Sequence, residues 1–235
     1  MTQTQSAVLT AIRDRLDEAT AGQWSDAQLR RWINEGARDM ARRTKHLKDT
    51  VTFTTTAGTG EYTVTANVIE VEGAYYAPGD GRQVPLVARA WEGMNNVWGQ
   101  YRDQQGGDPA MFTTWGFPPN LKVRLFPVPG SSSKTVTLYV SRLPVDLATD
   151  GTAASTAVDF PDAWIDAIYD FATFQALFKD RDPRWADAKN MYEQRVDQMI
   201  VNGDYMNVAM EMVADPLVQG GVLPRWLVDA GWGNW

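Results

Sequence analysis

The chain has 235 residues, of which 44% are hydrophobic, 22% charged and 11% aromatic, and its formal net charge is -7. This length and composition predict a globular protein with a sizeable core, so intrinsic disorder is excluded for most of the chain. The acidic balance disfavours a general nucleic-acid binder, because phosphate affinity comes largely from clustered Lys and Arg. The absence of cysteine excludes disulfides, thiolate catalysis and cysteine-based metal sites.

The first fifty residues carry two helical patterns. Apolar residues recur at spacings of three and four over residues 9–19, which predicts one amphipathic helix. After a break, Ser25 and Gln28 have the Ser-x-x-Gln form of a capping box, which marks the start of a second helix. Its apolar face continues over residues 29–47. We therefore expect two amphipathic helices in antiparallel arrangement.

From about Thr50 the periodicity of the sequence changes to two. The segments VTFTTT and EYTVTANVIEVEGAYY alternate β-branched and aromatic residues with polar ones, as half-buried strands do. MFTTWG, LKVRLFPVPG and KTVTLYVSRL predict three more antiparallel strands. The middle third of the chain is therefore predicted to be a small antiparallel β domain.

Helical periodicity returns in FPDAWIDAIYDFATFQALFKDRDP and in the segment that follows it. The break at residues 179–182 is short enough only for an antiparallel helix pair. Gly203 is predicted to close the last helix. Beyond it, Met206, Met210 and Met212 fit either a strand or a helix, and the sequence leaves that choice open.

These elements together predict an α+β fold. We expect a helical bundle made from the N-terminal and C-terminal helix pairs, with an inserted small antiparallel β domain and an extended C-terminal tail. The low-complexity segment DLATDGTAASTA predicts a linker on the way back to the helices. The expected boundaries are 1–49 and 158–203 for the bundle, 50–145 for the β domain, 146–157 for the linker and 204–235 for the tail.

The single histidine, His46, lies beside two lysines at the predicted end of a helix. A catalytic or metal-binding histidine needs partner residues at motif spacing, and the sequence supplies none. The GxSxG, P-loop, GxGxxG and HExxH motifs are absent as well. An exposed histidine in the last turn of a helix is the favoured interpretation, and neither a metal site nor a cofactor is expected.

Paired carboxylates are the remaining enzymatic candidates, because a glycosidase needs two of them across a sugar. Asp103 and Asp108 form one candidate pair in a Gly-rich loop, and a second group contains Asp159, Asp162 and Asp166 near a helix start. Carboxylates are common on protein surfaces and at helix N-termini, so structural roles are favoured. We predict no catalytic residue, although a peptidoglycan-degrading hydrolase and a carbohydrate-binding β module remain alternatives.

Basic residues are spread over the second predicted helix. Glu35 and Asp39 are placed to pair with them along the helix, which favours a solvated face over a nucleic-acid contact. Methionine-rich segments adapt to partner surfaces, which adds residues after Gly203 to the same group. The candidate subunit or partner interface is Arg30, Arg31, Arg38, Arg42, Arg43, Met206, Met210 and Met212.

The C-terminal end is rich in tryptophan, in LPRWLVDAG and the final GWGNW. Chain ends are usually frayed unless something ties them down. Large aromatic side chains beside an arginine, with few other charges, are typical of interface anchors. The predicted partner-binding residues of this tail are Leu223, Pro224, Arg225, Trp226, Leu227, Trp232 and Trp235.

In this order along the chain, WSDAQLRRWINEGARDMARRT, TFTTTAGTGEYTVTANVIEVEGAYY, GDPAMFTTWG, KVRLFPVPG and FPDAWIDAIYDFATFQALFKDRD resemble the head-to-tail adaptor proteins of tailed bacteriophages. The likeness runs from about Ser6 to Gly203. It implies a twelve-fold ring beneath the portal that extends the DNA channel and presents a docking surface to the next tail component. In such adaptors the C-terminal segments attach to the portal, which would account for the terminal tryptophans.

The resemblance also defines the expected partners and location. The partners are the portal protein, further copies of the chain in a homo-oligomeric ring, and a downstream tail or nozzle protein. Genomic DNA is expected to pass through without specific binding. The N-terminus lacks signal-peptide features and no run approaches the roughly 18 apolar residues of a membrane span, so no membrane is expected. The expected location is the head–tail neck of the virion, after assembly in the cytoplasm of the host bacterium.

Overall fold

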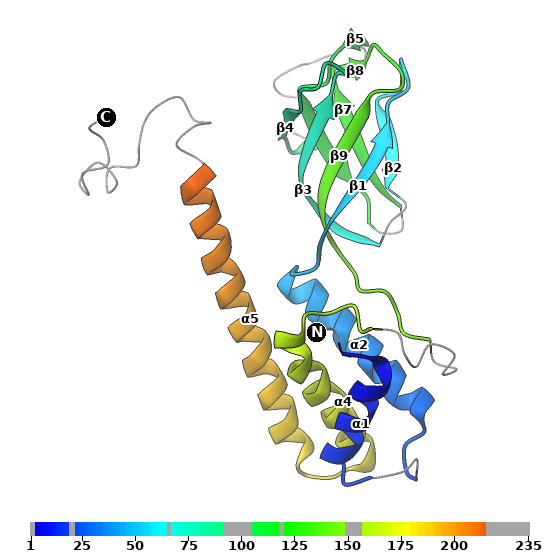
Figure 1. Cartoon of the computed structure of the whole chain (residues 1–235), viewed down its shortest axis with the longest axis vertical. Coiled ribbons are helices and arrows are strands. Elements are labelled where there is room, and N and C mark those ends of the chain that lie inside the picture. The colour runs from blue at the N-terminus through cyan, green and yellow to red at the C-terminus, as the bar shows by residue number, and fades with distance from the viewer. Residues whose placement is uncertain are drawn as a thin grey trace, which may run out of the picture.

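Helices form both ends of the described chain and a sheet lies between them in sequence (Figure 1). The computed structural model describes residues 3–18, 22–64, 67–91, 105–117, 120–148 and 157–214. Its helices are α1 (Gln5–Arg15), α2 (Asp26–Thr44), the short 3₁₀ helix η1 (Asp162–Trp164), α4 (Ile165–Asp180) and α5 (Trp185–Ala214). The sheet stands beyond one end of α2, and the chain crosses to it after α2 and returns before α4.

The start of α2 follows directly from its sequence. The Ser25 side chain accepts a hydrogen bond from the backbone N–H of Gln28, whose side chain accepts one from the N–H of Ser25. The capping box confirms the predicted helix start, because two N-terminal donors that lack helical partners are satisfied. At the other end, Lys45 adopts a left-handed conformation with φ of 50° and turns the chain towards the sheet.

One hydrophobic core lies among the helices. Ile12 of α1, Ile33 and Met40 of α2, Ile168 of α4 and Met199 of α5 are all fully buried in it. Each helix thus contributes an apolar stripe, and burial of these stripes is the main contribution to their association. The two helix pairs, far apart in sequence, therefore depend on each other for a shared core.

The larger β element is a seven-stranded sheet with the strand order β1-β9-β3-β4-β6-β7-β2. Its strands are β1 (Lys48–Thr54), β2 (Glu61–Val64), β3 (Val68–Ala77), β4 (Val84–Ala88), β6 (Met111–Trp115), β7 (Leu121–Phe126) and β9 (Thr135–Arg142). β5 (Gln105–Gly107) and β8 (Val128–Pro129) form a separate two-stranded parallel pair. In the large sheet β4 and β6 run parallel, whereas the other neighbours are antiparallel, so the sheet is mixed.

The seven strands curl into a near-barrel around a second core (Figure 1). Leu138 and Val140 of β9, Val123 and Leu125 of β7, and Val136 at the start of β9 are almost completely buried there. Alternate residues of these strands face outwards, as the period of two requires. The first and last strands of the order, β1 and β2, approach each other through Phe53 and Tyr62, whose rings stack at 4.6 Å.

The predicted fold class is therefore wrong. A helical bundle with a small antiparallel insertion was expected. Instead, a large mixed sheet dominates the middle of the chain, and the helices come before and after it in the sequence. Alternation in a sequence predicts strands but does not tell how many of them share one sheet. Nor does it reveal a parallel pair, which here is formed by Val87 with Met111 and Ala88 with Phe112.

The expected tail differs from the structure as well. The last helix does not end near Gly203, because α5 continues to Ala214. Met206, Met210 and Met212 thus lie on helical backbone, which resolves the choice between helix and strand. In Figure 1 this end of α5 extends past α4 and away from the other helices. Residues 215–235 lie outside the described chain.

Candidate functional site

The candidate carboxylates near the helix start make structural contacts. Asp159 binds the Arg142 guanidinium through both oxygens and accepts a hydrogen bond from the Val145 N–H. Asp162 accepts a hydrogen bond of 3.0 Å from the backbone N–H of Gln3. The side-chain hydrogen bond from Arg142 lowers the pKa of Asp159, which is the opposite of what a general acid requires.

Asp166 belongs to an ion network that joins three helices. On α4, Asp166 pairs with Arg15 of α1 at 3.1 Å and with Arg195 of α5 at 3.4 Å. Asp170, one turn further, is only 4% exposed and contacts the same two arginines. A buried carboxylate is stable only with such partners, so this network fixes α1 and α5 against α4. The sequence prediction missed Asp170 and Arg15.

Of the other candidate pair, Asp103 and Asp108, the structure describes only Asp108. Asp108 accepts a hydrogen bond of 2.8 Å from the phenol of Tyr76, whereas Asp103 lies outside the described residues. Burial, together with the bond to Asp108, raises the pKa of Tyr76 to about 12. Tyr76 is therefore a neutral hydrogen-bond donor near neutral pH, and Asp108 orders the loop before β6.

His46 lies in the connection between α2 and β1, half-buried and edge-on to Trp164 at 6.1 Å. This ring contact joins the connection after α2 to η1. His46 is therefore not in the exposed position that was expected. Among the described residues, no group of three or more His, Asp or Glu side chains has an arrangement that would hold a metal ion.

Three members of the basic face on α2 are engaged within the chain. Arg30 is nearly buried and lies 3.7 Å from Asp26, and Arg38 pairs with Asp146. Arg43 contacts Glu193 of α5 at 2.7 Å. Hydrogen bonding by Glu193 raises the pKa of Arg43, so this cation is held firmly in an intramolecular pair.

The remaining two arginines of that group, Arg31 and Arg42, are exposed on α2. The five arginines therefore do not form one continuous cationic surface, and phosphate binding along this helix has little support. The side chains of Met206, Met210 and Met212 are not described. Leu223, Pro224, Arg225, Trp226, Leu227, Trp232 and Trp235 lie outside the described residues.

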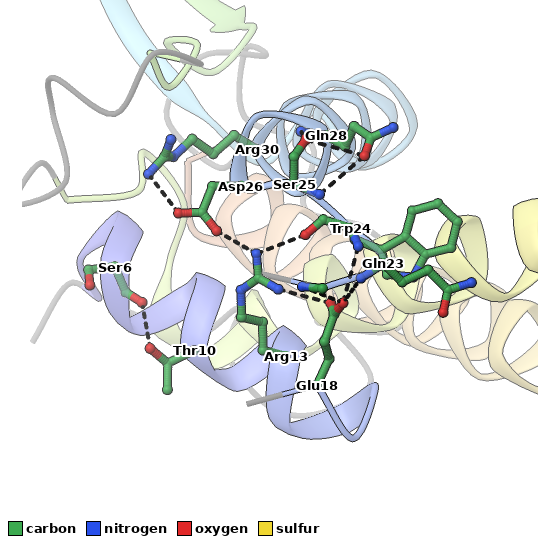
Figure 2. Close-up of polar contacts among 11 residues, drawn as sticks. Ser6, Thr10, Arg13, Glu18, Gln23, Trp24, Ser25, Asp26, Gln28 and Arg30 are labelled. Atoms are coloured by element: carbon green, nitrogen blue, oxygen red, sulfur yellow. Dashed lines mark hydrogen bonds and ion pairs between the residues drawn. The ribbon is translucent and has the colours of Figure 1, made fainter. Parts of the chain in front are cut away.

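A polar cluster at the junction of α1 and α2 was not foreseen from sequence (Figure 2). Arg13 is nearly buried, and its guanidinium donates to Glu18 at 2.9 Å, to the Trp24 carbonyl at 3.0 Å and to Asp26. Glu18 in turn accepts from the backbone N–H groups of Gln23 and Trp24. These contacts hold the start of α2 against the end of α1.

The joint between the helices and the sheet is likewise rich in ion pairs. Lys45 pairs with Glu70, and Lys48 pairs with Glu72 at the next step along β3. Arg142 lies 2.9 Å from Asp49, so it links β1 to the returning chain. Both crossings between helices and sheet are thus tied by opposite charges.

The polar contacts described above all lie within one chain and join its helices, its sheet and the connections between them. No helix in the described part of the chain is long and apolar enough to cross a membrane. Comparison with individually curated proteins gave no match. A family model described as SU10 adaptor protein matches residues 3–219, which is nearly the whole chain. The chain therefore belongs to the SU10 adaptor protein family, a family of phage head-to-tail adaptors, and the predicted resemblance is confirmed.

Proposed function

We propose that this protein forms a ring that joins the portal to the tail in the neck of the virion and extends the DNA channel. The family match is the observation that carries this proposal, because it covers both helix pairs and the sheet. The family is one of structural phage proteins. The ring is a homo-oligomer, twelve-fold if it follows the resemblance, and it assembles in the bacterial cytoplasm.

The charge of the chain suits a DNA channel. A net charge of -7 repels phosphate, so duplex DNA would slide through without sticking. The engagement of Arg38 and Arg43 in ion pairs supports the same view, because it removes cations from the surface available to DNA. Genomic DNA is thus a passing cargo and not a bound ligand.

The C-terminal segment is the proposed portal anchor. Residues 204–235 begin on the part of α5 that extends past α4, and continue into the tryptophan-rich end. Trp226, Trp232 and Trp235 would fill apolar pockets on the portal, as large aromatics do at the centre of interfaces. Many copies in a ring would multiply the effect of modest single contacts.

Each segment of the chain has its own proposed role in the ring. Residues 1–49 and 158–203 supply the helical part, 50–145 the sheet and 146–157 the returning connection. The sheet would face the downstream tail or nozzle protein, at the end of the molecule away from α1 (Figure 1). Because Asp159 and Asp166 are occupied by arginines, a hydrolase has less support than a structural role.

The test is co-elution with the portal protein from the same genome. Three versions would be compared: the full chain, a chain ending at Asp215, and a full-length variant with Trp226, Trp232 and Trp235 replaced by Ala. Binding by the full chain alone supports an adaptor anchored by its tail. Equal binding by all three versions would support an adaptor whose contact with the portal lies outside the tail. No binding by any version would contradict the proposal.

A further inference from the structure

The helices and the sheet have separate cores. Val136, Leu138 and Val140 of β9 are buried among other strand residues, and no residue of a described helix belongs to that core. Among the described strands, Ile69 of β3 is the residue that packs on the helix core, together with Leu143 just after β9. In Figure 1 the sheet stands beyond one end of α2 and is joined to the helices by two crossings of the chain. Relative motion of two such parts is expected unless a large hydrophobic interface prevents it.

The polar contact at the returning crossing is well covered. Arg142 is the last residue of β9, and its guanidinium binds both carboxylate oxygens of Asp159. Asp159 is fixed to the helical part, because its neighbours Val158 and Phe160 are buried in the helix core. The two paired side chains are only 25% and 27% exposed, and a two-pronged contact of arginine with a carboxylate has a defined geometry. We name the pair of Arg142 and Asp159 the pin.

The ion pair at the other crossing is more exposed. Lys45 caps the C-terminal end of α2, and its ammonium pairs with the carboxylate of Glu70 on β3. Each of these two side chains is 49% exposed, so water and salt screen the pair and its net contribution is small. We name the pair of Lys45 and Glu70 the latch. Because it is screened and consists of two long side chains, we expect the latch to open more often than the pin.

The pin and the latch lie on opposite sides of β9. The Ser141 hydroxyl lies 3.4 Å from the Lys45 carbonyl oxygen, which places the end of α2 on the face of β9 that carries Ser141. Consecutive residues of a strand point to opposite faces, so Arg142 points to the other face. Opening of the latch therefore leaves the sheet held on one side, about which it can tilt.

The neighbouring ion pairs lie within the sheet. Lys48 pairs with Glu72, but these residues belong to β1 and β3. Asp49, the second carboxylate beside Arg142, is also on β1. These contacts move with the sheet, so they remain whether the latch is open or closed.

We propose that the joint is a hinge, in which the sheet tilts about the pin when the latch opens. Closure and opening about a few residues at the ends of elements is a common form of conformational change. A tilt of this kind would let the far end of the sheet meet a partner while the helix core stays intact. The inference concerns the single chain and does not depend on the proposed ring.

The test follows the tilt through one distance in the full chain. The chain contains no cysteine, so Arg82→Cys, on the turn after β3, and Asn190→Cys, on α5, give two unique sites for spin labels. Both positions are exposed. Pulsed electron paramagnetic resonance would give the distribution of distances between the labels. It would be recorded at about 0.1 M and about 1 M salt, where the Debye length is about 10 Å and about 3 Å.

At the lower salt concentration the labelled chain should give a narrow distribution, which broadens at the higher one because salt screens the latch. Glu70→Gln should give the broad distribution at both concentrations, because the latch is already lost. Exchange of the two charges, by Lys45→Glu with Glu70→Lys, should restore the narrow distribution at the lower concentration. Glu61→Gln is the matched control. It removes a partly exposed ion pair with Lys122 inside the sheet, and it should behave as the labelled chain does.

A narrow distribution for Glu70→Gln at both salt concentrations would overturn the hinge. Broadening by salt that is equal with and without Glu70→Gln would also overturn it, because another contact then controls the tilt. The pin has a readout of its own, since the Val145 N–H donates to Asp159 at 3.0 Å. Hydrogen exchange of this amide should be equally slow in Glu70→Gln and in the labelled chain. Faster exchange would contradict the pin as the pivot, because the sheet would then detach from the helices instead of tilting.

Discussion

Asn34 of α2 and Leu147 of the returning chain form a reciprocal pair of hydrogen bonds. The Asn34 amide donates to the Leu147 carbonyl at 3.0 Å, and its oxygen accepts from the Leu147 N–H at 2.9 Å. Both groups are buried, and the Leu147 side chain joins the helix core. The Asn34 side-chain amide thus pairs with the Leu147 backbone as the backbone of a neighbouring strand would. These two bonds fasten the chain that returns from the sheet to α2.

Replacing Asn34 by Ala should therefore destabilise the protein. The change leaves a buried N–H and a buried carbonyl at Leu147 without partners, at a cost of about 2 kcal/mol. Urea unfolding followed by circular dichroism would measure it. Asn190→Ala, on the exposed side of α5, is the control and should change the midpoint little. Equal midpoints for the two variants would mean that the reciprocal bonds contribute nothing.

Gly36 of α2 lies directly against Phe171 of α4. A Cβ atom at this position would lie 2.8 Å from the Phe171 ring, which is too close for any carbon contact. Gly36→Ala should lower the free energy of unfolding by about 1–3 kcal/mol, as overpacking does. Gly73→Ala, in β3, meets no atom within 4 Å and should be nearly neutral in the same unfolding experiment. A neutral Gly36→Ala would show that the two helices separate easily.

Asp170 and Asp166 allow a matched comparison of a buried and an exposed carboxylate. Asp170→Asn removes the buried charge between Arg15 and Arg195 and should cost about 2–3 kcal/mol, because the buried group loses its ion pairs. Asp166→Asn affects the same arginines at a half-exposed site and should cost less than about 1 kcal/mol. Thermal unfolding at low and high salt would measure both. Equal effects would contradict the assigned role of burial.

Asp159 should make stability depend on pH in the acidic range. Its pKa is lowered below the ordinary 3.8, first by the hydrogen bond from Arg142. A lowered folded-state pKa means that this stabilisation is present above the unfolded pKa and is lost as pH falls through the folded value. The difference in unfolding free energy between the native chain and Asp159→Asn should therefore shrink from about pH 6 to about pH 3.

The control for that experiment is Asp187→Asn, at an exposed position on α5. Its difference from the native chain should be small at both ends of the range. A difference for Asp159→Asn that stays constant with pH would show that the contact with Arg142 does not depend on the charge of Asp159.

Local signals predicted where the helices and several strands lie, although not where the last helix ends. The capping box at Ser25 and Gln28 placed the start of α2, because its hydrogen bonds are made between neighbouring residues. The order of patterns along the chain indicated the family, which the match over residues 3–219 confirms. In both cases the information lies in short stretches or in their sequence order.

The remaining features depend on contacts between distant residues. The pairing of β4 with β6 in parallel and the closing of the sheet have no local signature, which explains the wrong fold class. Arg13 and Asp170 carry no motif that marks them in the sequence, and only tertiary packing buries them beside opposite charges. Arg38 was predicted to be available to partners, but Asp146, in the chain that returns from the sheet, pairs with it.

The most direct test of the central claim is the structure of particles assembled without this chain. The gene would be deleted from the phage genome, and particles would be examined by electron microscopy with and without the full chain supplied in the host. A head-to-tail adaptor predicts heads that carry a portal and no tail, with tails restored by the full chain. Tailed particles of normal appearance in the absence of the chain would contradict the account.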